Sequence, residues 1–125
     1  MLKGAVLYAK NLDTLSRFYI GIGGTQTDGV VGDFVALATS DAELIILQIP
    51  MEIASQIEIK TPPTVRSATP VKPIISVESI DDVLQILSEL GGMTVPASSP
   101  WKYRKHLVQD VVDPKGNVIQ LWQSV

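Results

Sequence analysis

Residues 111–123 of the chain read VVDPKGNVIQLWQ. A β-branched pair enters this stretch, an Asp-Pro and a Gly-Asn dipeptide typical of turns lie at its centre, and an alternating strand leaves it. In the exit strand Ile119 and Leu121 lie on one face, and Gln120 and Trp122 lie on the other. The first face suits a helix-covered core. We expect function on the second face, because a buried amide or indole needs a polar partner or a ligand.

Outward from this hairpin, the chain is expected to form two halves with the same order of elements. In the first half we expect a strand, a helix and three strands at residues 4–9, 12–22, 25–30, 34–39 and 43–49. In the second half we expect the same order at residues 72–77, 80–90, 93–96, 106–112 and 118–123. Asn11 and Ser79 precede the two helices and are typical N-cap residues. Residues 50–71 contain several prolines and are expected to link the halves, with one or two helical turns at residues 51–57.

The two halves form an internal repeat. Residues 4–24 align with residues 72–92 without a gap, and the later strands match after a small insertion in the second half, with Ile46 placed on Gln120. We therefore predict an α+β fold in a single domain of two β-α-β-β-β modules, at about residues 1–50 and 71–125. The two sheets are expected to form a curved, cup-like mixed sheet with the helices on its outer face.

Composition limits the possible partners. The chain has 125 residues, a net charge of −3 and a pI near 5.0, which argues against binding to nucleic acid. It contains no cysteine, which excludes disulfides and thiolate metal sites. No apolar run reaches the length of a membrane span, so we expect no membrane partner and a cytoplasmic location.

A paired strand–helix–three-strand repeat that ends in Asp-Pro-x-Gly-Asn-x-Ile-x-Leu resembles the vicinal oxygen chelate superfamily. This superfamily includes glyoxalase I, bleomycin-resistance proteins, fosfomycin-resistance enzymes and extradiol dioxygenases. The resemblance covers essentially the whole chain, and residues 113–117 are its most specific part. It implies a lyase, a dioxygenase or a small-molecule binding protein, and it also implies a homodimer.

The resemblance further implies a divalent metal held by His and Glu side chains in the first and last strand of each module. By pattern these positions fall on Gly4, Lys72, Ile46 and Gln120. Glycine and isoleucine offer no ligand atom, glutamine is a weak one, and a protonated lysine repels a cation. The single histidine, His106, lies in a different strand. We therefore expect no metal and no cofactor.

Lys72 stands out among the candidate site residues, since it shares the inward parity of its strand with Ser76. It could anchor an anionic or carbonyl-bearing ligand, and a desolvated amine at this position could act as a nucleophile. The alternative is a lysine at the start of a strand with its ammonium group in solvent.

The remaining candidates are aromatic, amide and basic side chains. Gln120 and Trp122 are expected to share the inward face with Ile46 and Gln48 of the first module, and Tyr8 is expected to point the same way. Residues 101–106 are basic and aromatic and could gate a ligand, or clamp an acidic group with Arg104; a solvated loop is the alternative. The candidate ligand-binding set is Tyr8, Ile46, Gln48, Lys72, Ser76, Trp101, Arg104, Gln120 and Trp122.

Three functions remain open on this sequence. The first is a metal-independent protein that binds a small organic molecule in the sheet cup. The second is an enzyme, either a lyase or isomerase that uses Lys72 and Tyr8 as acid and base groups, or a metal enzyme with other ligands. The third is a non-catalytic dimeric interaction module, for which the apolar residues 44–49 together with Met51, Ile53 and Ile57 would suit an interface.

Overall fold

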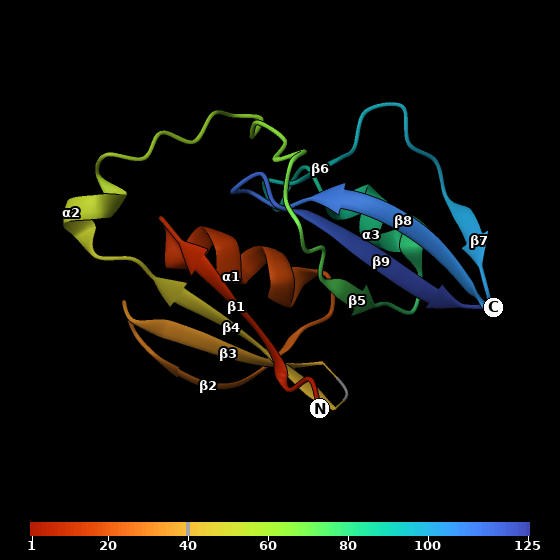
Figure 1. Cartoon of the computed structure of the whole chain (residues 1–125), viewed down its shortest axis with the longest axis horizontal. Helices are drawn as coiled ribbons and strands as arrows, with labels where there is room; N and C mark the ends of the chain where they lie inside the picture. The colour runs from red at the N-terminus through yellow and green to blue at the C-terminus, as the bar shows by residue number, and fades with distance from the viewer. Residues whose placement is uncertain (40) are drawn as a thin grey trace. The chain divides into compact units, whose positions relative to one another are not determined.

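The computed structural model describes residues 1–39 and 41–125, and the chain divides into two compact units, Met1–Ile59 and Lys60–Val125. Each unit combines one mixed sheet with a helix that packs on it, which makes the fold α+β as predicted (Figure 1). In the part of the chain that the structure describes, no helix is long and apolar enough to cross a membrane.

The first unit contains a four-stranded sheet in the order β1-β4-β3-β2. Its elements are β1 (Gly4–Ala9), α1 (Leu12–Gly21), β2 (Thr25–Val30), β3 (Phe34–Thr39), β4 (Ala42–Gln48) and the short α2 (Met51–Ala54). β1 pairs with β4 in parallel, and the other neighbours are antiparallel. The bounds of β1, β2 and β3 are those predicted from the sequence.

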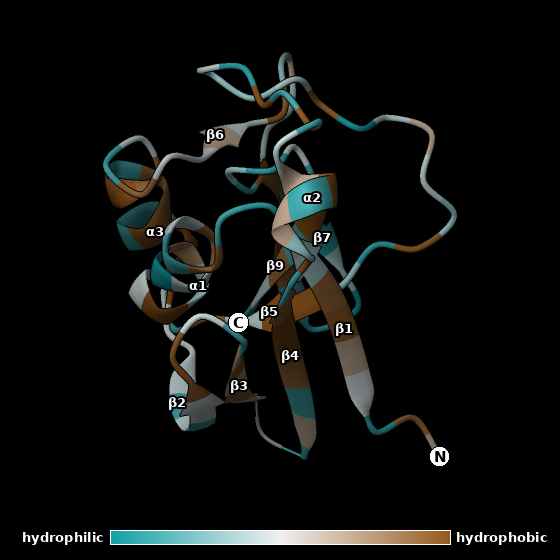
Figure 2. Ribbon diagram, turned by 90° about the vertical axis from the view of Figure 1, so that its left-hand side faces the viewer, coloured by the Kyte–Doolittle hydropathy of each residue, from teal (hydrophilic) through white to brown (hydrophobic). Residues whose placement is uncertain are grey.

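The core of the first unit lies between α1 and one face of this sheet. The Asn11 side chain accepts a hydrogen bond from the Thr14 N–H and so caps α1, as predicted. Below the cap, the helix buries an apolar stripe against β3 and β4, which Figure 2 shows as mostly hydrophobic along β4. The buried contacts come from Leu12, Leu15, Phe18, Tyr19, Leu37, Leu44 and Ile46.

The second unit contains a five-stranded sheet in the order β5-β9-β8-β6, with β7 also paired to β8. Its elements are β5 (Ile74–Ser76), α3 (Ile80–Ile86), β6 (Met93–Thr94), β7 (Trp101–Tyr103), β8 (His106–Val112) and β9 (Val118–Ser124). The Ser79 side chain caps α3 by accepting from the Asp82 N–H, as predicted. The helix packs on β8 and β9, whose buried residues on that face include Gln109, Val111, Ile119 and Leu121.

The second unit differs from the prediction in several element bounds, including a shorter β6, and in one additional strand. β5 begins at Ile74, because Pro73 has no N–H to donate and Lys72 precedes the strand. α3 ends at Ile86, after which i→i+3 bonds such as Leu90 N–H to Leu87 O tighten the chain into turns. Residues 101–103 form β7, a strand that the sequence pattern did not predict.

The 113–117 turn joins β8 and β9 through a buried carboxylate. Asp113 is fully buried and accepts hydrogen bonds from the Lys115 N–H at 2.9 Å, the Asn117 N–H at 3.0 Å and the Asn117 side-chain amide at 2.9 Å. Burial lowers the pKa of Lys115, the nearby Arg66 guanidinium lowers it further, and Asp113 acts in the opposite direction. The turn is thus fixed by side chains as well as by its backbone.

The linker segment at residues 64–66 packs on the far side of the same turn. The Arg66 N–H donates to the Gly116 carbonyl at 2.9 Å, and the Arg66 Nε donates to the Lys115 carbonyl. Gly116 has φ +92°, and an added Cβ would lie 2.1 Å from the Thr64 carbonyl oxygen. Glycine at this position therefore permits both the turn and the close approach of the linker.

In both units a glutamine side chain accepts a hydrogen bond from the first N–H of the helix, and this shared contact corrects the alignment of the modules. The Gln48 side chain accepts from the Leu12 N–H at the start of α1, and the Gln123 side chain accepts from the Ile80 N–H at the start of α3. Since Leu12 and Ile80 match in the repeat, Gln48 matches Gln123, and the residue that matches Gln120 is one position before Ile46.

The parallel pairing gives the same correction. Val6 pairs with Ile45 and Ile74 pairs with Gln120, so Ile45 is the counterpart of Gln120. The predicted placement of Ile46 and Gln48 on the face opposite the helix is therefore wrong. Ile46 is fully buried beneath α1, and Gln48 is engaged with the end of β1 and the start of α1.

Alanine at either glutamine is expected to destabilise its unit, and Gln48→Ala more than Gln123→Ala. The Gln48 amide also donates to the Ala9, Lys10 and Ile49 carbonyls, so its loss should lower the free energy of unfolding by about 2 kcal/mol, against about 1 kcal/mol for Gln123. Urea unfolding of both variants tests this, with the exposed Gln56→Ala as control. Equal effects, or none, would contradict the proposed helix-start role.

Candidate functional site

The candidate site lies on the face of the second sheet that points away from α3, which we call the aromatic face. Directly paired residues of neighbouring strands project on the same side of a sheet, and alternate residues share a side. The pairings therefore place three rows of side chains across this face. They are Tyr103, His106 and Ser124; Trp101, Val108, Trp122 and Ser76; and Asp110, Gln120 and Ile74.

Aromatic rings at one end of this face contact one another. The Tyr103 and Trp122 ring centroids are 5.7 Å apart in an edge-to-face arrangement, and the His106 ring lies 4.6 Å from Trp122. The Arg104 guanidinium lies over the Tyr103 ring, 5.4 Å from its centroid. Trp101 is 40% exposed and Tyr103 is 47% exposed, so ring surface remains accessible to a ligand.

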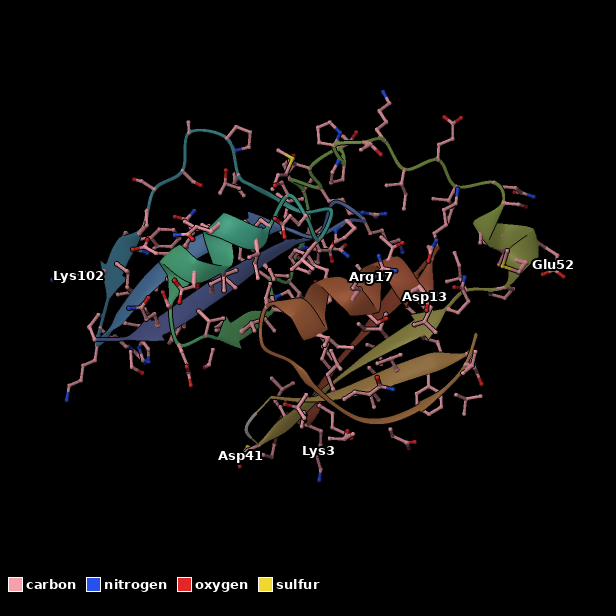
Figure 3. All side chains as sticks on the ribbon, turned by 180° about the vertical axis from the view of Figure 1, so that it is seen from behind. Lys3, Asp13, Arg17, Asp41, Glu52 and Lys102 are labelled. Carbon is pink, nitrogen blue, oxygen red and sulfur yellow. The ribbon has the colours of Figure 1, made fainter. Side chains whose placement is uncertain are left out.

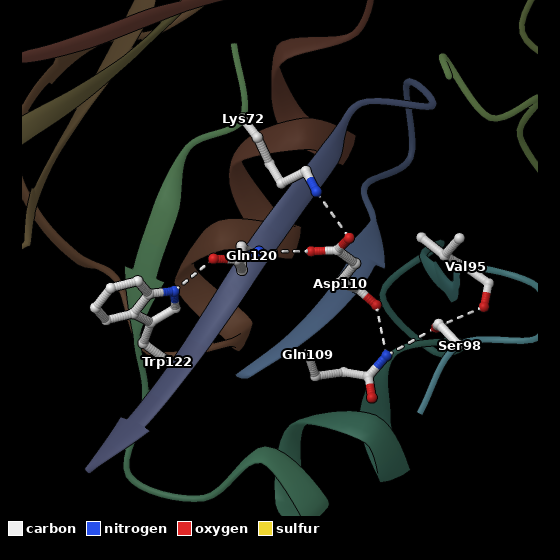
Figure 4. Close-up of polar contacts among 7 residues, drawn as sticks. All are labelled: Lys72, Val95, Ser98, Gln109, Asp110, Gln120 and Trp122. Carbon is white, nitrogen blue, oxygen red and sulfur yellow. Dashed lines mark hydrogen bonds and ion pairs between the residues drawn. The ribbon is translucent and has the colours of Figure 1, made fainter. Parts of the chain in front are cut away.

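A chain of polar contacts continues from the Trp122 ring (Figure 4). The indole N–H of Trp122 donates to Gln120 Oε1 at 2.6 Å, and Gln120 Nε2 donates to Asp110 Oδ1 at 3.1 Å. Asp110 Oδ2 accepts from the Lys72 ammonium group at 2.8 Å. The Gln120 amide uses both of its ends in this chain, which fixes its orientation and that of the indole.

A second polar group supports the sheet from its other face. The buried Gln109 side chain donates to Ser98 Oγ and to the Asp110 carbonyl, both at 2.9 Å, and Ser98 donates to the Val95 carbonyl (Figure 4). These bonds hold the loop after β6 against β8. They thereby fix the segment that leads into β7 and its two aromatic residues.

His106 contributes the one unsatisfied atom of the cluster. Among the described residues that are not exposed, its Nδ1 is the only buried side-chain nitrogen or oxygen without a hydrogen-bond partner. Buried polar atoms usually find partners, so each exception calls for a specific explanation. The exception here lies in direct ring contact with Trp122.

The structure brings together most of the predicted site residues of the second module. Lys72, Ser76, Trp101, Gln120 and Trp122 all lie on the aromatic face or in contact with its residues. Lys72 is anchored by Asp110 and its side chain is 41% exposed, so it lacks the desolvation that a nucleophilic amine requires.

The candidates of the first module belong to the other unit. Tyr8 belongs to the first unit, on the sheet face away from α1, and its side chain is 58% exposed. Ile46 and Gln48 face α1, as described above. The predicted inward set of the first module is therefore reduced to Tyr8.

Sequence reasoning left Tyr103, His106 and Asp110 out of the candidate set, although each lies on the aromatic face. The sequence signal that could have identified them is period-two alternation. It places Trp101 and Tyr103 on one face of a strand, and His106 and Asp110 on one face of the next strand. The turn between these runs, Arg104-Lys105, lacks glycine and asparagine, so the pattern did not indicate a hairpin.

The metal that the resemblance implies does not fit these residues. In the described part of the chain, no three His, Asp or Glu side chains lie together in a way that could hold an ion. Near Gln120 the only carboxylate of the network is Asp110, and it faces the Lys72 ammonium group. A side chain at Gly4 would place its Cβ 1.8 Å from the Glu43 carbonyl, and Ile45, the true counterpart of Gln120, offers no donor atom.

Two concave regions lie in the first unit and include none of the candidate residues. A groove of about 460 Å³ is lined by residues of α1 and of the β2–β3 hairpin, and its lining includes Asp13 and Arg17, which Figure 3 labels on α1. A hollow of about 260 Å³ lies at residues 3–6 beside Glu43 and Ile45.

The Lys72–Asp110 ion pair is expected to contribute little to the free energy of unfolding. Its main expected effect is to hold the Gln120 and Trp122 side chains in one orientation. A double-mutant cycle with Lys72→Met and Asp110→Ala should give a coupling free energy below about 1 kcal/mol, because the pair is partly exposed. Asp110→Ala should nevertheless change the tryptophan fluorescence, since Gln120 then loses its acceptor. An unchanged spectrum would contradict the role of Asp110 in positioning Trp122.

The chain shares its fold with solved structures described as glyoxalase/bleomycin resistance proteins and dioxygenases. The chain is similar to a glyoxalase/bleomycin resistance protein from Albidiferax ferrireducens, with a TM-score of 0.68 and 16% identity over 100% of this chain and 99% of the other. A glyoxalase/bleomycin resistance protein/dioxygenase family enzyme from Burkholderia phytofirmans matches with a TM-score of 0.68 and 14% identity, over 98% of both chains.

A bleomycin resistance determinant encoded on transposon Tn5 shares the fold at a TM-score of 0.59 and 14% identity, over 99% of this chain and 98% of the other. No family model and no curated protein matches the chain. The predicted resemblance is therefore confirmed at the level of the fold.

Proposed function

We propose that the protein binds a small organic molecule on the aromatic face of its second unit, without a metal ion. The observation that carries this proposal is the difference between the two modules. Val6, Ile45 and Leu47 of the first module correspond to Ile74, Gln120 and Trp122 of the second. One copy of the repeat thus has apolar residues where the other has an amide and an indole.

The insertion in the repeat supports the same proposal. Residues 31–33 join β2 to β3, whereas residues 95–105 join the corresponding strands β6 and β8. The longer connection contains β7 and so adds Trp101 and Tyr103 beside Trp122. Binding residues are often carried on added loops above a rigid scaffold, and here the loop supplies aromatic surface that the fold itself does not need.

The chemistry of the face suits a planar ligand. Exposed rings offer stacking area, and the polar network fixes the indole so that little side-chain entropy is lost on binding. Lys72 donates to Asp110 and its ammonium group has further N–H donors for a ligand carbonyl. The bleomycin resistance determinant that shares the fold gives a precedent for a resistance protein on this scaffold.

A homodimer is part of this proposal, with an interface narrowed to part of the predicted set. Leu44 and Ile46 of the apolar β4 strand are core residues of the first unit, which accounts for their hydrophobicity. Met51 and Ile53 of α2 remain 68% and 54% exposed and are the better interface candidates. Light scattering of the wild type and of a Met51→Glu/Ile53→Glu variant tests this, and a monomeric wild type would overturn it.

Titration calorimetry with 2-naphthamide and cyclohexanecarboxamide tests the proposed binding. We expect the planar amide to bind with a 1:1 stoichiometry and the non-planar amide to bind weakly. The affinity for the planar amide should be the same with a chelator as with added Zn²⁺, Ni²⁺ or Mn²⁺. The Trp122→Leu substitution should lower the affinity for the planar ligand by about tenfold. Val31→Ala, at an exposed residue, should leave that affinity unchanged. Binding that requires metal, or that Trp122→Leu leaves intact, would overturn the proposal.

A further inference from the structure

The β7–β8 turn holds a cation at an unusual backbone position beside the aromatic rings. Tyr103 pairs with His106, so Arg104 and Lys105 form a two-residue hairpin turn. Arg104 has φ +55°, a conformation that glycine adopts readily and that costs an L residue free energy. A strained non-glycine residue at such a position is a reason to examine what its side chain does.

The Arg104 side chain is exposed and lies over Tyr103. Within residues 1–39 and 41–125, no hydrogen bond or ion pair joins its guanidinium to another side chain. Lys72, the other cation of the face, is bound to Asp110. The Lys72 ammonium group keeps only some of its N–H donors, whereas the Arg104 guanidinium has no such side-chain partner among the described residues and can offer its planar set of donors to a ligand.

The turn segment beside these rings is rich in basic residues, although the chain as a whole carries −3. Residues 101–106 include Lys102, Arg104 and Lys105 and contain no acidic residue. Asp110, the carboxylate of the face, lies two rows away from Tyr103 and has both oxygens engaged. The end of the face that carries Arg104 therefore favours an anion.

We propose that the ligand is an aromatic carboxylate, with its ring against Tyr103 and Trp122 and its carboxylate on the Arg104 guanidinium. Arg104 lies 5.4 Å from the Tyr103 centroid, which in turn lies 5.7 Å from Trp122. These distances suit a carboxylate attached to the ring directly or through one or two methylenes. Guanidinium and carboxylate form a bidentate pair, which gives the site its preference over a neutral amide. The inference rests on the proposed function, since it assigns the chemical class of ligand to the same face.

The test uses pairs of molecules that differ only in charge. Benzoate, phenylacetate and 3-phenylpropionate are each compared with the corresponding primary amide, and binding is followed by tryptophan fluorescence. The chain contains 2 tryptophans, Trp101 and Trp122, and both lie on the aromatic face, so the intrinsic signal reports on this site alone. We expect at least one carboxylate to bind about tenfold tighter than its amide in the wild type, and high salt to reduce the difference.

Variants at Arg104 separate the carboxylate contact from folding. In Arg104→Gln the preference for each carboxylate over its amide should fall to within about twofold. Arg104→Gly relieves the backbone strain and should melt no lower than the wild type while also losing the preference. Ala97→Gly is the matched control, because Ala97 also has positive φ (60°) and is not part of the aromatic face; it should keep the preference.

The outcomes distinguish this inference from the function on which it rests. Equal binding of carboxylates and amides in the wild type would overturn the carboxylate assignment and leave the aromatic ligand site in place. A preference that survives Arg104→Gln but is lost in Lys72→Gln would also overturn it, since the anion would then be bound at Lys72. No binding of either member of any pair, together with a negative 2-naphthamide titration, would overturn both.

Discussion

Replacement of Asp113 by alanine is expected to lower the free energy of unfolding by about 3 kcal/mol. The carboxylate is fully buried and accepts three hydrogen bonds from Lys115 and Asn117, so its removal leaves buried donors without a partner. For a chain of this length the melting temperature should fall by roughly 10 °C or more. Thermal and urea unfolding measure both quantities.

Asp33→Ala is the matched control for this prediction. Asp33 lies in the β2–β3 turn of the other module, and it is exposed. Its replacement is expected to change stability by less than about 0.5 kcal/mol. Comparable losses in the two variants would show that turn chemistry in general, and not the buried carboxylate, stabilises the β8–β9 hairpin.

Gly116→Ala is expected to have the second large effect, a loss of about 2–4 kcal/mol. Two separate costs add at this position. An L side chain is strained at φ +92°, and its Cβ would lie 2.1 Å from the backbone oxygen of Thr64. Because the contact is with backbone, the segment at residues 64–66 must move, and the bond from the Arg66 N–H to the Gly116 carbonyl is weakened.

Gly32→Ala isolates the first of these costs. Gly32 has φ +78° in an exposed turn, and an added Cβ there meets nothing within 4 Å. We expect a loss of about 1 kcal/mol from backbone strain alone. If Gly116→Ala is no worse than Gly32→Ala in urea unfolding, the linker does not depend on close contact with the turn.

The sequence was sufficient to predict the fold because the local signals agreed with one another. Helix caps at Asn11 and Ser79, period-two strands and the Asp-Pro and Gly-Asn turn all indicate the same order of elements, and the structure has that order with β7 added between β6 and β8. The alignment of the modules failed by one residue at the last strand. Leu44 to Leu47 of β4 are all apolar, so no alternation indicates which side chains point toward the helix. Only the strand pairing and the Gln48 contact show which face each β4 residue occupies.

The candidate site was predicted in part. Gln120 and Trp122 were placed on the functional face because alternation in β9 is clear. Asp110 could not be placed, since Val111 and Val112 follow it and hide the period of β8. β7 escaped prediction because its turn has Arg104 at a φ where glycine is expected, so the sequence carried no hairpin signal there. The residues that the sequence missed are those at the strained turn and at the insertion.

The central claim is that ligands bind on the aromatic face, and ¹H–¹⁵N NMR of the wild-type protein tests it most directly. The two indole N–H signals belong to Trp101 and Trp122, and the Gln120 side-chain amide lies between Trp122 and Asp110. On titration with 2-naphthamide in the presence of a chelator, these three sets of signals should shift progressively and saturate together, while the amides of α3 remain unchanged. Saturating shifts confined to other parts of the chain, with both indole signals unmoved, would contradict the account.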